Sequence, residues 1–118
     1  MHNFKNLKVW QKSRELVKEI YLLTKSFPKE EIYGITSQIK RSSISIASNI
    51  AEGTGRNSNK DFIRFLDIAN GSAFELETQI ILAFDLNFIT KSKMEVVLNK
   101  IKEIQKMIYG LKNKIQAS

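Results

Sequence analysis

The stretch that decides the fold runs from residue 38 to residue 80 and reads QIKRSSISIASNIAEGTGRNSNKDFIRFLDIANGSAFELETQI. Its first half interleaves isoleucines with serines and alanines, and its second half repeats apolar residues at helical spacing from Phe62 onward. A short polar segment with Gly53 and Gly55 separates the halves. This pattern predicts two long helices joined by a tight turn, with small side chains in both helices.

The second of these helices has the most regular apolar pattern. Its apolar residues follow one another at alternating intervals of four and three: Phe62, Leu66, Ala69, Ala73, Leu76, Ile80 and Ala83. Such spacing places them on one seam, as in coiled coils. A serine hydroxyl can accept from the free amides of a helix start, and an acidic residue is favoured three positions later, so Ser58 and Asp61 suit the beginning. We therefore predict a helix over residues 58–87.

Three further helices are predicted, at about residues 6–25, 33–52 and 92–116. The first ends before Pro28, because proline cannot continue a helix. Gly53 is expected to cap the second in the left-handed conformation that glycine adopts easily. Ser92 and Glu95 have the spacing of a capping box at the start of the last.

We thus expect an all-α protein in which residues 1–118 form a single domain, an antiparallel up-down-up-down four-helix bundle. Running the helices 33–52 and 58–87 in opposite directions from the turn places residues 42–45 beside residues 69–72. Small side chains, including Gly71, would then meet small side chains, and the two helices would approach closely.

The amino-acid composition limits the kinds of protein that this chain can be. The chain has 118 residues, 42% of them hydrophobic, with no cysteine and a net charge of +7. Residues 61–90 carry one basic and five acidic side chains, whereas residues 91–118 carry seven basic and two acidic ones. No apolar stretch approaches the roughly 20 residues that a membrane span needs. We expect a cytoplasmic protein with no signal peptide and no membrane association.

Enzymatic chemistry has little support. The only histidine, His2, lies near the start of the chain, so the body of the chain cannot supply a serine–histidine–aspartate triad. Cysteine is absent, and metal sites would therefore lack the usual sulfur and imidazole ligands. The segment with Gly53 and Gly55 follows a predicted helix rather than a strand, which disfavours a phosphate-binding loop. We expect no catalytic residue, no metal and no cofactor.

Basic residues are the best candidates for contacts with a partner. Around the predicted turn and on helix 33–52, we expect Lys40, Arg41, Arg56 and Lys60 to contact nucleic acid through its phosphates. Two predicted helices carry further lysines that could follow a phosphate backbone: Lys5, Lys8, Lys12, Lys18, Lys91, Lys93, Lys100, Lys102, Lys106, Lys112 and Lys114. The alternative is that lysines only keep the protein soluble, in which case it is a structural or protein-interaction scaffold.

A second polar group is expected to be structural. In the antiparallel arrangement Arg64 lies near Asn49 and one turn from Glu52. We predict that these three side chains form an internal hydrogen-bonded cluster rather than a ligand site.

Three runs of sequence resemble a known family: 4–10 (FKNLKVW), 38–56 (QIKRSSISIASNIAEGTGR) and 62–66 (FIRFL), continued by ELETQ at 75–79. They resemble the 23S ribosomal RNA intervening-sequence protein family, also called the four-helix bundle protein family. The resemblance covers about residues 4–90 and implies a four-helix bundle that assembles as a homopentamer. A related branch is the accessory protein of diversity-generating retroelements, which associates with a reverse transcriptase and nucleic acid. The resemblance thus implies three partners: other copies of the chain, RNA or DNA, and a nucleic-acid enzyme.

Overall fold

A computed structural model describes residues 3–118 of the chain, so the sequence-based expectation for His2 lies outside the described residues. Four long helices, α1 (Lys8–Thr24), α2 (Ile35–Thr54), α3 (Asn59–Asp85) and α4 (Lys91–Gln116), account for most of it. The short 3-10 helices η1 (Phe4–Asn6) and η2 (Lys29–Glu31) precede α1 and α2. None of residues 3–118 forms a strand, which confirms the all-α class.

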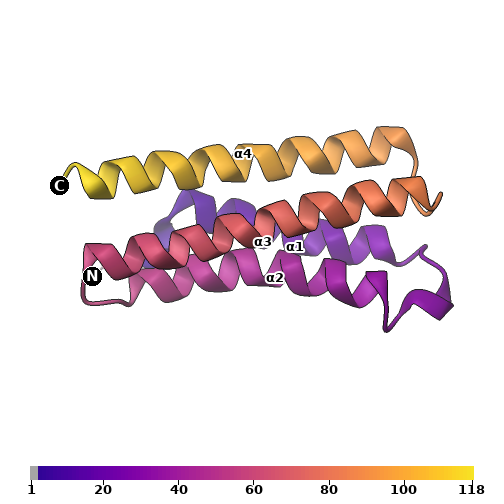
Figure 1. Ribbon diagram of the computed structural model, residues 1–118, viewed down its shortest axis with the longest axis horizontal. Helices are drawn as coiled ribbons and strands as arrows, with labels where there is room; N and C mark the ends of the chain where they lie inside the picture. Colours follow the sequence, from indigo (N-terminus) through magenta and orange to yellow (C-terminus); the bar gives the residue numbers. More distant parts are fainter. Residues whose placement is uncertain (1–2) are drawn as a thin grey trace.

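The helices lie side by side, and each runs opposite to the one before it, in up-down-up-down order (Figure 1). The bundle measures 46 × 24 × 20 Å. Helix α2 packs along both α1 and α3, and α4 packs along α3, whereas the contact between α1 and α4 is the least extensive of the four. Two ion pairs cross that last interface, Lys12–Glu103 at 3.8 Å and Glu19–Lys100.

The core contains the predicted seam of α3. Every residue of the α3 pattern is buried, and Leu66, Leu76 and Ile80 are fully inaccessible. Helix α4 contributes its own heptad residues to the same core: Val97, Ile101, Ile104, Ile108 and Ile115. Burial of these side chains accounts for the two longest helices, because each isolated apolar stripe would otherwise face water.

The α2–α3 interface contains small side chains, as predicted. The hydroxyls of Ser45 and Ser72 lie 2.8 Å apart, and Ser42 donates to a carboxylate oxygen of Glu75, also at 2.8 Å. These contacts place residues 42–45 beside residues 72–75, so the expected register of 42–45 with 69–72 was wrong by about one helical turn, although Ser45 and Ser72 do meet. The prediction for Gly71 was wrong, because a Cβ there would meet nothing within 4 Å. Gly71 is exposed and makes no close approach.

Gly53 has a different role from the one expected. It lies inside α2, which continues to Thr54, and no glycine of residues 3–118 has a positive φ. A Cβ at position 53 would be 2.9 Å from Cδ1 of Phe62 and 3.0 Å from Cβ of Phe65. The left-handed cap was therefore wrong, and the glycine instead makes room for two aromatic residues of α3.

The helix starts agree only in part with the expected caps. The Ser58 hydroxyl accepts from the amide of Asp61 at 3.1 Å, as predicted. Helix α4 begins one residue before Ser92, so Thr90 is its cap and accepts from the amide of Lys93 at 3.2 Å. The observed cap, Thr90, thus lies two residues before Ser92, which was expected to be the cap. Helix α2 begins at Ile35 rather than at residue 33, because η2 and a turn precede it.

Candidate nucleic-acid interface

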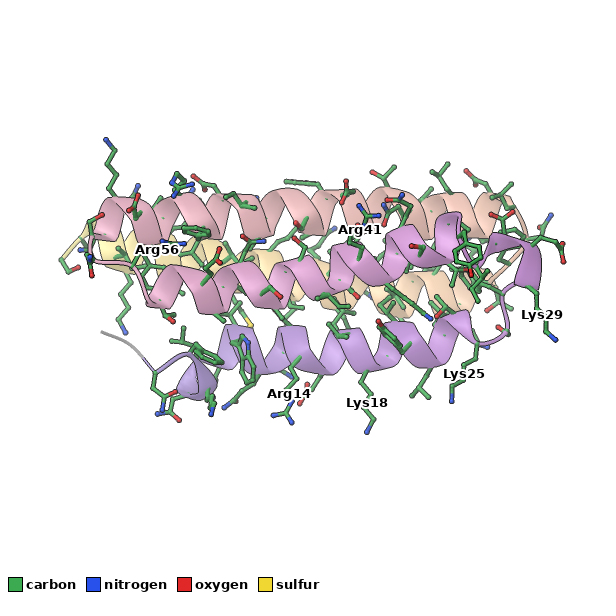
Figure 2. The ribbon with its side chains drawn as sticks, turned by 90° about the horizontal axis from the view of Figure 1, so that it is seen from below. Arg14, Lys18, Lys25, Lys29, Arg41 and Arg56 are labelled. Carbon is green, nitrogen blue, oxygen red and sulfur yellow. The ribbon has the colours of Figure 1, made fainter. Side chains whose placement is uncertain are left out.

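One long edge of the bundle carries exposed cations. Arg14 and Lys18 are one turn apart on α1, Lys25 follows the end of this helix, and Lys29 begins η2. Figure 2 shows all four side chains extending away from the bundle along the same edge. None of the four takes part in an ion pair within residues 3–118. We call these four residues the α1 edge.

These cations face away from the bundle because the opposite face of α1 packs into the core. Leu16 and Ile20 are buried on that face, and Ser13 is accommodated there by donating to the carbonyl of Val9 at 2.7 Å. Intervals of four and seven residues return to the same side of a helix. Arg14 and Lys25 are thus separated by about 16 Å along the helix direction, at a rise of about 1.5 Å per residue.

An aromatic residue lies next to this edge. The guanidinium carbon of Arg14 is 5.7 Å from the centre of the half-buried Trp10 ring, and Phe4 meets this ring edge-on at 5.0 Å between centroids. A surface hollow lined by Trp10 and Arg14 also includes Lys5, Lys18 and the acidic Glu15. Its three cations outnumber its one carboxylate, so the hollow is positively charged overall.

The four cations expected from the sequence do not gather in one place. Lys40 is half-buried, with its Nζ 4.6 Å from the centre of the Tyr21 ring, whereas Arg41 is exposed. Arg56 and Lys60 lie at the α2–α3 turn, about 24 Å from Lys40 along α2 at a rise of about 1.5 Å per residue. Figure 2 shows Arg41 and Arg56 well apart along the bundle. The four residues therefore lie in two places, Lys40 and Arg41 on α2 and the other two at the turn.

The predicted cluster of Asn49, Glu52 and Arg64 is not formed. The Asn49 amide donates to the carbonyl and hydroxyl oxygens of Ser45 on its own helix, at 2.8 and 3.0 Å. The other two members have local ion pairs of their own, Glu52–Arg56 at 3.8 Å and Arg64–Asp61 at 3.6 Å. Side chains one turn away within each helix are nearer partners than side chains across the interface.

Two arginine side chains of this region, Arg56 and Arg64, lie against the ring of Phe65. This ring is buried, and the guanidinium carbons of Arg56 and Arg64 lie 4.5 and 4.7 Å from its centre. A cation over an aromatic face is attracted by the electron density of the ring. The Arg56 and Arg64 side chains are nonetheless 42% and 58% exposed, so they add positive charge to the surface at the turn.

Sequence reasoning selected Lys12 as a surface cation, but this side chain reaches Glu103 of α4. It missed Arg14, Lys25 and Lys29. The four-residue interval from Arg14 to Lys18 could have been recognised from the sequence as one face of a helix. Lys25 and Lys29 lie beyond the end of α1, where helical periodicity does not predict the direction of a side chain. Only the path of the chain around Pro28 brings them onto the same edge.

Neither a cluster of metal ligands nor a membrane-spanning helix occurs among the described residues. Among residues 3–118 there is no group of three or more histidine, cysteine, aspartate or glutamate side chains that could hold a metal ion. Within the same range, no helix is long and apolar enough to cross a membrane.

These features define a small all-α protein, a four-helix bundle with a cationic edge. Residues 5–110 match the 23S rRNA-intervening sequence protein family, and the chain belongs to this family. It is also similar to a solved structure from Bacteroides thetaiotaomicron VPI-5482, described as a protein with unknown function from the S23 ribosomal protein family. The two are 32% identical with a TM-score of 0.82, over 88% of this chain and 97% of that chain. Comparison with curated proteins gave no match.

Proposed function

We propose that this protein is a non-enzymatic accessory factor that binds the phosphate backbone of RNA or DNA in the cytoplasm. The observation that carries the proposal is the α1 edge, where Arg14, Lys18, Lys25 and Lys29 extend from one side of the bundle without acidic partners. Cations that are not neutralised by neighbouring carboxylates can replace the counterions condensed on a phosphate chain. Arg41, Arg56 and Lys60 add separate contacts.

This edge favours binding without strong sequence preference. Contacts to phosphates hold and orient a protein on nucleic acid but carry no direct information about the bases. The long side chains of Arg14, Lys18 and Lys25 are flexible, and this flexibility suits a phosphate chain of any sequence. A role beside a nucleic-acid enzyme such as a reverse transcriptase, which the family resemblance suggests, would need this kind of contact.

The proposal includes a homo-oligomer, and the family resemblance suggests a pentamer. Apolar side chains on the outer side of α3 support it, because Ile68, Leu82 and Leu86 are 42%, 47% and 53% exposed. Covering such side chains with a second copy would remove them from water. Five copies, each with a net charge of +7, would carry roughly +35 and attract nucleic acid over a long range.

The test is a binding titration with fluorescein-labelled RNA and DNA at several salt concentrations. The key variant is Arg14→Gln/Lys18→Gln/Lys25→Gln, and its matched control is Lys91→Gln/Lys93→Gln/Lys114→Gln, which loses the same charge from α4. We expect the key variant to weaken binding much more and to lower the salt slope on duplex DNA by about 2.7, or about 0.9 per lost contact.

Two results would overturn the proposal in different ways. Equal weakening by both variants would show that overall charge, and not the α1 edge, is responsible. No binding by the unaltered protein at about 50 mM salt, where phosphate contacts are strong, would favour the alternative of a protein-interaction scaffold. A solution mass of 13.6 kDa would overturn the oligomer.

A further inference from the structure

A groove between α3 and α4 differs in character from the α1 edge. It has a volume of about 320 Å³ and is lined by Asn70, Phe74, Lys102, Gln105, Lys106 and Tyr109. Aromatic, amide and ammonium groups therefore share one surface hollow. We refer to these six residues as the α3–α4 groove.

Its aromatic side chains are unusually open to solvent. Phe74 is 56% exposed and Tyr109 is 66% exposed, whereas Phe62 and Phe65 on the same bundle are buried. Neither Phe74 nor Tyr109 has a ring–ring or cation–ring contact within residues 3–118. Exposed rings of this kind can stack on the flat face of a nucleobase, a contact that every base can make.

Hydrogen-bonding groups of the same groove lack partners. The side-chain oxygen of Asn70 and the side-chain nitrogen of Gln105 are both buried, and neither has a hydrogen-bond partner within residues 3–118. A buried polar atom without a partner is costly, so a ligand that supplies one is favoured. One group is an acceptor and the other a donor, and the edge of a nucleobase offers both complements. Because both atoms are buried, a base reaches them only when a side chain of the groove turns aside, and Tyr109, which is 66% exposed, has the room to do so.

The remaining residues of the groove suit a phosphate. Lys102 and Lys106 are one turn apart on α4, and neither forms an ion pair within residues 3–118. Beyond Lys102, a neighbouring hollow contains Glu77 and Glu95, which would repel a phosphate chain. The strand is therefore expected to lie toward Lys106 and Tyr109.

From this combination we infer that the α3–α4 groove binds an unpaired nucleobase of single-stranded RNA or DNA. The base stacks on Phe74 or Tyr109, Asn70 and Gln105 bond to its edge, and Lys102 and Lys106 hold its phosphates. Duplex nucleic acid does not fit this site, because its bases are stacked on one another and paired. The inference rests on the proposed function and adds a preference for single strands to it.

The test compares oligothymidylate and oligouridylate with a DNA duplex, using the variants Phe74→Ala, Tyr109→Ala and Gln105→Leu. Removal of one stacking ring is expected to weaken single-strand binding about tenfold and to leave duplex binding unchanged. Gln105→Leu should weaken both single strands to a similar extent, since thymine and uracil present the same hydrogen-bonding edge. The control is Tyr33→Ala, which removes an aromatic residue that is 93% exposed and lies outside the groove.

The possible failures are distinguishable. Binding of duplex and single strands without any effect of Phe74→Ala or Tyr109→Ala would overturn the groove while the proposed function stands. An equal loss for duplex and single strands would also overturn it. A smaller solution mass for the alanine variants would show that the groove is a contact between copies instead. No binding to any probe would overturn the proposed function itself.

Discussion

Gly53 of α2 lies against Phe62 of α3 so closely that a Cβ at position 53 would be 2.9 Å from Cδ1 of the Phe62 ring. The same Cβ would be 3.0 Å from Cβ of Phe65. Both aromatic residues are buried, so neither ring can simply swing into solvent. The absence of a side chain at position 53 therefore sets how closely the two helices approach near their connecting turn.

Substituting Gly53→Ala should destabilise the bundle. The added methyl group overfills a packed interface, and such changes cost about 1–3 kcal/mol. Urea unfolding followed by circular dichroism measures the effect. Gly55→Ala is the control, because its Cβ would lie 3.6 Å from the nearest atom, the carbonyl oxygen of Glu52. An unfolding midpoint unchanged in Gly53→Ala would contradict the close approach.

Substituting alanine for either of two other glycines should stabilise the protein rather than destabilise it. Gly71 in α3 and Gly110 in α4 are both helical, and a Cβ at either position would meet nothing within 4 Å. Alanine loses less conformational entropy than glycine on helix formation, so Gly71→Ala and Gly110→Ala should each stabilise the protein by about 1 kcal/mol. Thermal unfolding of both variants tests this. A lower melting temperature for either would show that its surface is covered, for example by another copy.

A large side chain in the serine contact should weaken the α2–α3 interface. Ser45→Leu would lose the 2.8 Å contact with Ser72 and crowd the α3 backbone, at a cost of about 1–3 kcal/mol. Ser48→Leu makes the same chemical change at an exposed position of the same helix, where we expect an effect within about 0.5 kcal/mol. Equal unfolding midpoints for these two variants would argue against a tight interface.

The start of α4 provides a direct comparison between two candidate caps. Thr90→Ala removes the hydroxyl that accepts from the amide of Lys93 and should cost about 1 kcal/mol. Ser92→Ala lies in the first turn and should change stability little. Denaturant midpoints of the two variants decide between them, and a larger loss for Ser92→Ala would restore the cap expected from sequence alone.

The exposed side of α3 predicts where copies of the chain associate. Leu82→Lys places a charge where the proposed contact would exclude water, so we expect a smaller assembly with an intact helical spectrum. Light scattering gives the mass. Leu22→Lys is the matched control, since Leu22 is 55% exposed on α1. An unchanged mass for Leu82→Lys would place the interface elsewhere.

The candidate site was predicted far less well than the bundle. The sequence indicated that cations would dominate the surface, and Arg41 and Lys60 are exposed as expected. It could not show that Lys12 reaches Glu103, that Lys40 lies on Tyr21, or that Lys25 and Lys29 continue the α1 edge. Long flexible side chains find partners on neighbouring helices, and sequence spacing describes only one helix at a time.

The amino-acid sequence by itself determined the helical class, the seam from Phe62 to Ala83, and the meeting of small side chains of α2 and α3 at Ser45 and Ser72. These follow from local periodicity and from the requirement that apolar stripes be buried. Only the tertiary structure decided that Gly53 makes room for Phe62, that Gly71 faces open space, and that exposed aromatics and unpartnered amides share the α3–α4 groove. Those relations depend on the distance and rotation between helices, which are set by the packing of the whole core.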